Sequence, residues 1–494
     1  MKDPVAIAIS WMLTLAGGCL VAPAVVALAC GEYRGIPLFL IPAAICWLYV
    51  WRCRRVGRRA DGRLADRNAF LFVGKTWVII MALGAIPLFL YGFSSTDKGL
   101  ADNITDAVFE SVSGFTATGA TVFADVESFP KCINFWRCMM HWLGGMGIIA
   151  LALAVLPKVG INTSALMKAE ASGSDRGRLT VKIGDTAKVL IGIYFAMTVA
   201  ELMLLRFAGL GWFDSVCHAL SNTATGGFST RNESIRAFGN PAVEWICTVF
   251  MLAGAVNYAC YFMLLTGRFR KFLQNSELRA FALIVAVATG VCTFVQWGRE
   301  PLADALRHCA FEVAAVISTT GFMGSDYTEW APAAQMVIFV LCVIGGCSGS
   351  TSGGVKVVRW TVLWKQLRND VAKLIHPHGV YTIRLDGEAG RESIVPSVSA
   401  FVFVYFMLVL LTATAAAFSG MEIKAALTSS MSMVGNIGPA FGEFGGASLG
   451  PAGCYGTVAP YVKWVFSGAM LAGRLEIYTL LILVGDITSR KAEE

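Results

Sequence analysis

Charged residues are scarce in this chain of 494 residues. Asp, Glu, Lys and Arg make up 15% of the sequence, whereas hydrophobic residues make up 56%. A soluble globular domain carries about a quarter charged residues, so that class of protein is excluded. In place of charge, the sequence holds apolar runs of about 20 residues, long enough to cross a hydrocarbon core of about 30 Å. The runs are 5–29, 36–51, 70–90, 189–207, 281–296, 398–418 and 462–484. The composition predicts an all-α polytopic membrane protein.

Motifs of enzymes and of resident cofactors are also missing. The 14 cysteines form no CxxC pair and no metal-type spacing, which excludes a zinc, haem or disulfide framework. No HExxH helix and no G-x-G-x-x-G dinucleotide fingerprint occur. Gly349 and Gly354 have the spacing of a phosphate-binding loop, but Val355 stands where such a loop requires lysine. The chain is therefore predicted not to be an enzyme and to hold no cofactor.

Basic residues are concentrated in four blocks between apolar runs. Loops rich in Lys and Arg face the cytoplasm, so the net charge of +7 is an orientation signal and does not indicate nucleic-acid binding. The first run is too long for the apolar core of a signal peptide, and with 36–51 it predicts a retained hairpin whose N-terminus is cytoplasmic. The blocks are Arg52, Arg54, Arg55, Arg58, Arg59, Arg63 and Arg67; Lys158, Lys168, Arg176, Arg178, Lys182 and Lys188; Arg268, Arg270, Lys271 and Arg279; and Lys356, Arg359, Lys365, Arg368, Lys373 and Arg384.

The intervals between basic blocks share one plan. Each holds an apolar span, a segment too short and polar to cross the membrane, a polar stretch with glycine, and a second span. The short segments are 104–115, 212–222, 306–317 and 423–432. They predict re-entrant half-helices in a fourfold internal repeat. The predicted units are a hairpin with its basic loop at 1–67 and repeats at 68–160, 161–267, 268–385 and 386–494.

The polar stretches that end the half-helices predict an ion pathway. Non-helical backbone at membrane depth is tolerated only inside protein or beside water, and rings of backbone carbonyls replace the hydration shell of a cation. Glycine permits positive φ, hydroxyls extend the ligand set, and the negative ends of the half-helices favour a cation. The four stretches are Thr116, Ala117, Thr118, Gly119; Thr223, Ala224, Thr225, Gly226; Ser318, Thr319, Thr320, Gly321; and Gly435, Asn436, Ile437, Gly438. The alternative is that small residues here only permit close helix packing.

A second glycine-rich stretch interrupts the second span of the third repeat. Because glycine costs about 1 kcal/mol per residue in a helix interior, this stretch must break the span. Its place predicts an intramembrane gate just below the carbonyl ring, with a packing kink as the alternative. The predicted gate residues are Gly345, Gly346, Cys347, Ser348, Gly349, Ser350, Thr351, Ser352, Gly353 and Gly354. Arg474 lies inside the last apolar run, where a charge faces a cavity or a partner, and Glu476 is placed too close in sequence to pair with it on one helix face.

These motifs resemble the Trk/Ktr/HKT superfamily of potassium transporters, most of all the bacterial TrkH/TrkG branch. The resemblance covers nearly the whole chain. It is carried by SGFTATGAT at 113–121, WLGGMGI at 142–148, WFDSVCHALSNTATGGFST at 212–230, STTGF at 318–322, GGCSGSTSGGVKVVR at 345–359, VGNIGP at 434–439 and MLAGRLEIY at 470–478. The chain departs from many relatives at Ala117, Ala440 and His141, where Thr, Gly and Gln are common.

The resemblance implies a potassium-uptake subunit in the bacterial inner membrane. Four filter glycines imply K+ as the transported ion, and Arg474 is implied to lie in the cavity below the filter, near the gate. The implied partners are a second copy of the chain and a cytoplasmic, nucleotide-binding regulatory subunit of the TrkA type. Channel-type passage and symport with H+ or Na+ both stay open. A secondary carrier for another cation or small solute is the alternative function, although such carriers are built from inverted halves.

Overall fold

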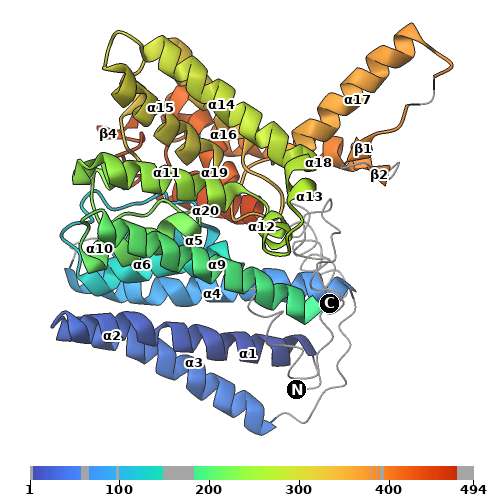
Figure 1. Ribbon diagram of the computed structural model, residues 1–494. Coiled ribbons are helices and arrows are strands. Elements are labelled where there is room, and N and C mark those ends of the chain that lie inside the picture. Colours follow the sequence, from blue (N-terminus) through green and yellow to red (C-terminus); the bar gives the residue numbers. More distant parts are fainter. Residues whose placement is uncertain are drawn as a thin grey trace.

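The computed structural model describes residues 4–56, 66–95, 99–147, 183–379, 381–385, 388–389 and 394–475. In these residues, six helices are long and apolar enough to cross a membrane, and a seventh span results if one bent pair is counted. Most helices lie side by side in one bundle, and α17 (Val357–Ile375) projects away from it (Figure 1). The predicted polytopic helical fold is confirmed.

The N-terminal hairpin packs on the outside of the first repeat. It consists of α1 (Pro4–Cys19), α2 (Val21–Ala29), the 3-10 turn η1 (Tyr33–Gly35) and α3 (Ile36–Val56). The first apolar run forms α1 and α2, which meet at Leu20 and together make one candidate span from Ile9 to Ala29. Pro23 in the first turn of α2 lacks the N–H that an uninterrupted helix would use at this place.

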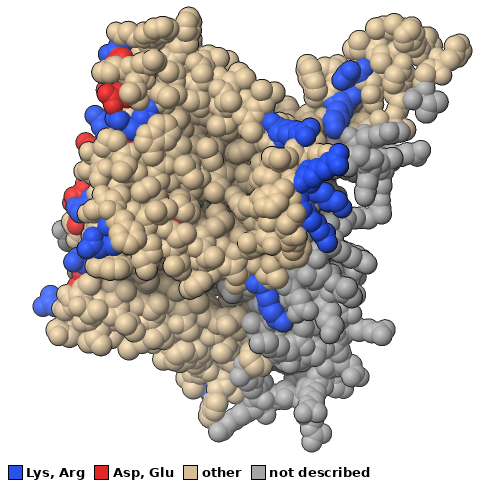
Figure 2. Space-filling view, viewed as in Figure 1, with Lys and Arg blue, Asp and Glu red and all other residues tan. Residues whose placement is uncertain are grey.

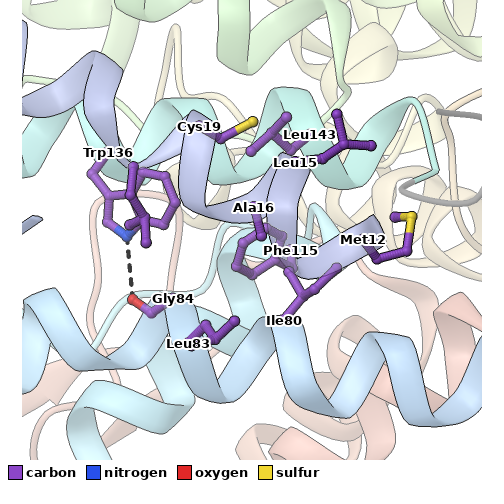
Figure 3. A pocket seen from close by; sticks show the side chains of 11 residues that line it. Met12, Leu15, Ala16, Cys19, Ile80, Leu83, Gly84, Phe115, Trp136 and Leu143 are labelled. Carbon is purple, nitrogen blue, oxygen red and sulfur yellow. Dashed lines mark hydrogen bonds between the residues drawn. The ribbon is translucent and has the colours of Figure 1, made fainter. Parts of the chain in front are cut away.

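Where the hairpin meets the first repeat, apolar side chains of α1 surround a small cavity with those of α4, α5 and α6 (Figure 3). The cavity measures about 30 Å³. On its far side, Trp136 Nε1 donates to the carbonyl of Gly84 at 3.2 Å. Phe115 from the end of α5 also lines it, so the hairpin supports the first half-helix from behind.

The four first spans and the four half-helices follow the predicted order. The spans are α4 (Asp66–Ser95), α9 (Ile183–Phe207), α14 (Ser276–Gln296) and α18 (Ile394–Ala417), and the half-helices are α5 (Leu100–Thr116), α10 (Trp212–Thr223), α15 (Leu302–Ile317) and α19 (Ile423–Gly435). Two half-helices begin one turn earlier than predicted, since Asp102 and Asp304 in their first turns complement the positive helix end. The half-helices are largely buried, whereas only 17% of the span in α14 is buried, so the half-helices form the centre.

The helices of the second spans have 13 to 15 residues in the described part of the chain. They are α6 (Lys131–Gly145), α11 (Pro241–Ala255), α16 (Pro332–Ile344) and α20 (Pro460–Arg474), each with proline at its N-cap or first position. The sequence predicted a break only in the third. The structure also breaks the second repeat, where α12 (Tyr258–Leu265) turns 96° away from α11. The basic block from Lys158 to Lys182, downstream of α6, and Glu476, downstream of α20, lie outside the described residues.

The remaining elements are small. They are α13 (Phe269–Gln274), the 3-10 turns η3 (Ser234–Phe238) and η4 (Tyr327–Glu329), and the strands β1 (Arg384–Leu385), β2 (Glu388–Ala389), β3 (Glu443–Phe444) and β4 (Ala447–Ser448). The strands pair antiparallel as β1 with β2 and β3 with β4, which the all-α prediction did not include. The predicted boundary at 67 falls inside α4, and the one at 160 lies outside the described residues.

Charged side chains lie at two ends of the molecule. On the face in Figure 2, the acidic side chains gather at one end, and Lys and Arg alone colour the opposite end, with a wide uncharged band between them. The half-helices α10 and α15 begin toward the acidic end, and α12, α13 and α17 lie at the basic end (Figure 1). The two polar ends and the uncharged band match a protein that crosses a bilayer along the direction of its helices.

Candidate functional site

All four half-helices end in the same backbone motif. In the first, the N–H of Ala117 donates to the carbonyl of Gly114 at 3.1 Å, and the N–H of Thr118 donates to that of Ser113 at 2.9 Å. The same pair of bonds recurs in the other three half-helices. The left-handed residue of each motif has φ between 53° and 59° and is not glycine; the four are Ala117, Thr225, Thr319 and Asn436. A β-branched residue in this conformation is a genuine outlier, and such strain concentrates at functional sites.

This motif corrects the alignment of the second stretch by one residue. The positive-φ glycines that follow the left-handed residues are Gly119, Gly227, Gly321 and Gly438. Gly119 therefore corresponds to Gly227 and not to Gly226 as predicted. Thr223 is the last residue of α10, and the second stretch runs from 224 to 227. Two consecutive glycines allow either alignment by sequence, and only the position of the helix end decides between them.

The four stretches, which we call the filter segments, close into a ring. A Cβ added to Gly119 would collide with the carbonyl oxygen of Gly226 in the next segment. An added Cβ would meet a carbonyl oxygen of the next segment at each of the other three glycines as well. Gly227 faces the carbonyl of Thr320, Gly321 faces that of Ile437, and Gly438 faces that of Thr118 in the first segment. Each positive-φ glycine thus leaves room for a carbonyl of its neighbour. A cavity of about 60 Å³ is lined by these four glycines on the outer side.

The hydroxyls of the filter segments brace the backbone. Thr116 Oγ1 donates to the carbonyl of Val112 at 2.7 Å and lies 2.7 Å from Thr118 Oγ1. Ser318 and Thr320 form the same pair at 2.7 Å. Asn436 Nδ2 donates to Thr118 Oγ1 at 2.9 Å and so joins the fourth segment to the first. These hydroxyls were predicted as additional ion ligands, and in the structure they bond to neighbouring protein groups.

A buried polar side chain in each half-helix holds the chain that follows its filter segment. Glu110 accepts from the N–H of Val122 at 3.0 Å, and Glu312 accepts from the N–H of Gly324 at 2.8 Å. His218 Nε2 lies 2.9 Å from Ser229 Oγ, and Thr428 Oγ1 accepts from the N–H of Phe441 at 3.1 Å. Glu110, His218 and Glu312 stand at the same distance before their filter glycines. Sequence reasoning missed this set, because its members differ in residue type.

Two buried ion pairs join half-helices to second spans. Arg137 Nε of α6 lies 2.8 Å from Glu110 Oε1, and both side chains are at most 1% exposed. Lys463 Nζ of α20 lies 2.6 Å from Asp106 Oδ1. Charged side chains inside a membrane protein are ordinarily paired with one another or with backbone groups. The charges in these short spans were the signal in the sequence that could have predicted the two pairs.

The predicted gate stretch forms a loop that lies directly against the filter segments. The N–H of Gly353 donates to Thr319 Oγ1 at 2.7 Å, and Thr351 Oγ1 lies 3.1 Å from Thr225 Oγ1. An added Cβ on Gly353 would collide with the carbonyl of Gly435. The loop therefore touches the second, third and fourth segments at the end that faces away from the outer cavity, as predicted.

The gate loop is held at both sides. The N–H of Cys347 donates to the carbonyl of Ala255 at 2.9 Å, which satisfies a carbonyl left open where α11 ends. Glu277 in the first turn of α14 accepts from the N–H of Ser348 at 2.6 Å and from Ser348 Oγ at 2.9 Å. Glu277 was not predicted, because an acid in the first turn of a helix ordinarily only complements the positive end of the helix.

Arg474 links the gate loop to the first repeat. Its guanidinium donates to the carbonyl of Thr351 at 2.6 Å and to those of Gly144 and Gly145 at 2.6 and 2.9 Å. It stands at the end of α20, in the place that Gly145 has at the end of α6 and Ala255 at the end of α11. The prediction that Arg474 lies next to the loop is confirmed.

Comparison with known proteins places this geometry in a family. The family model of TrkH, described as a cation transport protein, matches residues 57–491. The chain belongs to the TrkH family. It is 35% identical over 480 residues to the Trk system potassium uptake protein TrkH of Salmonella typhimurium, with 96% of each chain covered. It is 30% identical to TrkG of Escherichia coli K12, over 96% of this chain and 95% of the relative.

A solved TrkH-family structure has the same fold. The crystal structure of the potassium transporter TrkH from Vibrio parahaemolyticus matches with a TM-score of 0.83 and 33% identity, covering 98% of both chains. Of the three departures from common TrkH residues, Ala117 is one of the left-handed residues, and the N–H of Ala440 donates to the carbonyl of Leu449 beyond the fourth segment. His141 packs behind the second segment.

Proposed function

We propose that this chain is the membrane subunit of a Trk-type potassium uptake system, in which K+ passes through the ring of filter segments. The closed ring of glycines and carbonyls carries this proposal. Carbonyl dipoles without formal charge hold a monovalent cation weakly enough for it to leave. The family assignment and the named function of the relatives support the same ion. Inward movement would be driven by the membrane potential, worth about 2.3 kcal/mol per charge per 100 mV.

The loop from Gly345 to Gly354 serves as the gate in this proposal. The loop lies on the inner side of the ring and contacts three of its four segments, so an ion leaving the ring meets it. Arg474 ties the loop to the first repeat, and its positive charge repels a cation there. Release of these bonds opens the path.

We place the chain in the inner membrane with its N-terminus in the cytoplasm. The basic end in Figure 2 supports this orientation by the positive-inside rule. A cytoplasmic subunit of the TrkA type then meets this end. A second copy of the chain pairs along α17, where Trp364, Leu367, Leu374 and Ile375 are exposed at 70%, 55%, 84% and 67%.

Ion flux into liposomes tests the function without other subunits. The purified chain is reconstituted, and uptake of K+, Rb+ and Na+ is measured beside the growth of a strain deficient in potassium uptake. We expect K+ and Rb+ to be carried in preference to Na+, and growth to be restored at low K+. Equal fluxes of all three ions would contradict a selective filter, and a coupled flux of another solute would favour a secondary carrier.

A further inference from the structure

The second filter segment lacks a side chain that the other three possess. Thr118, Thr320 and Ile437 occupy the residue before each filter glycine, and Gly226 has this place in the second segment. The φ angle of Gly226 is not in the positive range, so the backbone does not require glycine there. Space does, since an added Cβ would collide with Nδ1 and Cγ of His141.

His141 reaches this place from the first repeat. Its ring is fully buried and stacks on Phe228, with centroids 4.1 Å apart and planes inclined by 17°. Nδ1 lies 3.0 Å from Ser221 Oγ and accepts from the N–H of Phe228 at 3.4 Å. Nε2 of the same ring is buried and has no hydrogen-bond partner among the described residues. The imidazole thus touches the chain both before and after Gly226.

The other second spans place no ring where α6 places His141. Met251 in α11 and Met470 in α20 are fully buried and stand at the same distance from the ends of their helices as His141 does in α6. In α16 this place belongs to Val340, which is 46% exposed. The filter segment without a side chain is thus the one against which α6 places a rigid ring. Arg137 adds to the support, since its guanidinium lies 4.2 Å from the centroid of Phe228 and donates to the carbonyl of Ser229 at 3.3 Å.

We propose that His141 determines ion selectivity by positioning the carbonyl of Gly226. The imidazole of the first repeat replaces the side chain that the second filter segment lacks, and it fixes one quarter of the carbonyl ring from behind. This inference rests on the proposed K+ function. A cavity in place of the ring leaves the Gly226 carbonyl free to move, and a mobile carbonyl discriminates less between K+ and the smaller Na+.

A swap of side chains between the two positions tests the proposal. The variants are His141→Ala, His141→Gln, Gly226→Ser and the double variant His141→Ala with Gly226→Ser, each reconstituted in liposomes. We expect His141→Ala to lower the K+ to Na+ flux ratio about tenfold, equivalent to ~1.4 kcal/mol at a site. His141→Gln retains an acceptor for Phe228 and keeps the ratio within about threefold. Gly226→Ser alone is expected to abolish the preference for K+ over Na+. The double variant should regain most of the K+ to Na+ flux ratio, because residues in contact have coupled effects.

Controls separate this role from general packing. Phe72→Ala removes a fully buried ring in α4, more than three turns before Gly84, and is expected to lower the thermal midpoint without changing the flux ratio. An unchanged ratio in His141→Ala, or equal damage by Gly226→Ser in both backgrounds, would overturn the proposal. If His141→Ala does not fold, the double variant is compared with Gly226→Ser alone, because the serine fills the cavity that the missing imidazole leaves.

The thermal midpoints of the four variants are measured alongside flux. If His141→Ala raises the thermal midpoint that Gly226→Ser has lowered, the two side chains compete for one space. This measurement tests the packing without any transport. Absence of K+ flux in the wild type would instead contradict the proposed function. The two failures are therefore distinguishable.

Discussion

The outer and inner halves of the central site differ in symmetry. The four filter segments share one backbone conformation. Each has the same helix ending, a left-handed residue at the same position, and a positive-φ glycine two residues later. Below them, the described ends of the second spans differ: α11 turns by 96° into α12, α16 is followed by the loop of residues 345–354, and α20 ends in Arg474. Fourfold symmetry suits a fixed ring of carbonyls, and in the proposed function the asymmetric inner half supplies the gate that rests against this ring.

The largest effect is expected from breaking the symmetric half. Gly227→Ser puts a side chain at φ 88° against the carbonyl of Thr320, and Gly119→Ser does the same against Gly226. We expect both to lower the K+ to Na+ flux ratio by about tenfold or more. Gly239→Ser is the matched control, because its φ is 55° but nothing lies near the added Cβ. If Gly227→Ser transported like the control, the corrected alignment of the second segment would be wrong.

Changes in the buried ion pair of Glu110 and Arg137, which supports the filter segments, are expected to lower stability. Glu110→Ala leaves Arg137 buried without its carboxylate, and removing one partner of a buried pair costs about 3–5 kcal/mol. Thermal unfolding in detergent measures this loss. Replacing both residues, as Glu110→Leu with Arg137→Met, should recover part of it. A double variant as unstable as the single one would mean that the pair acts only through its other contacts.

The asymmetric half is expected to respond in rate. Arg474→Ala removes three hydrogen bonds from a charged group, each worth about 1.5–3 kcal/mol. A shift of ~1.4 kcal/mol in the gate equilibrium changes its open fraction about tenfold, so K+ flux should rise by about that factor. The K+ to Na+ ratio should stay unchanged. Arg474→Lys retains the charge, so a high flux in this variant as well would assign the effect to the lost bonds alone.

A smaller effect is expected at the anchor of the gate loop. Glu277→Gln keeps the shape of the side chain but weakens its bonds to Ser348, since bonds to a charged group are about twice as strong as neutral ones. Flux should rise by about threefold or less. Amide hydrogen exchange of residues 345–354 reports the loosening directly. Exchange equal to that of the wild type would show that α11 holds the loop without Glu277.

The smallest effect is expected at the outer surface. Asn232 Nδ2 donates to Asp125 at 3.0 Å, and this bond lowers the pKa of the Asp125 carboxyl. A depressed pKa stabilises the contact between the first and second repeats above the ordinary aspartate range, and the contribution is lost as the pH falls through the lowered value. Hydrogen exchange of the outer loops as the pH is lowered should show the loss in the wild type. Asp125→Asn should abolish the pH dependence.

Much of the fold was predictable because the membrane imposes strong patterns. Run lengths predicted the first spans, and the glycine content of residues 345–354 predicted the break in the third repeat. The break between α11 and α12 was missed, since an apolar sequence does not reveal a 96° turn. The residues at one equivalent position differ in type between repeats, being Glu110, His218 and Glu312, and this difference hid their common role. Their equal spacing shows only when Gly227, and not Gly226, is taken as the glycine of the second segment.

The alignment of the second filter segment shows a further limit of sequence. TATGG offers two glycines, and the first gives the better match in letters. The helix end selects the second, because Thr225 and not Ala224 takes the left-handed conformation. Similarly, His141 stood out in the sequence only as a departure from relatives. Its role depends on a contact with Gly226, 85 positions away in the numbering of the chain.

In the proposed function, the carbonyls of Thr118, Gly226, Thr320 and Ile437 form one cation-binding ring. Anomalous scattering from Rb+ in crystals of the wild-type chain locates the bound ion. We expect a peak on the central axis within coordination distance of all four oxygens, and loss of this peak in Gly227→Ser. If the chain carries Rb+ in liposomes but the ordered Rb+ lies away from these oxygens, the ring is not the ion site.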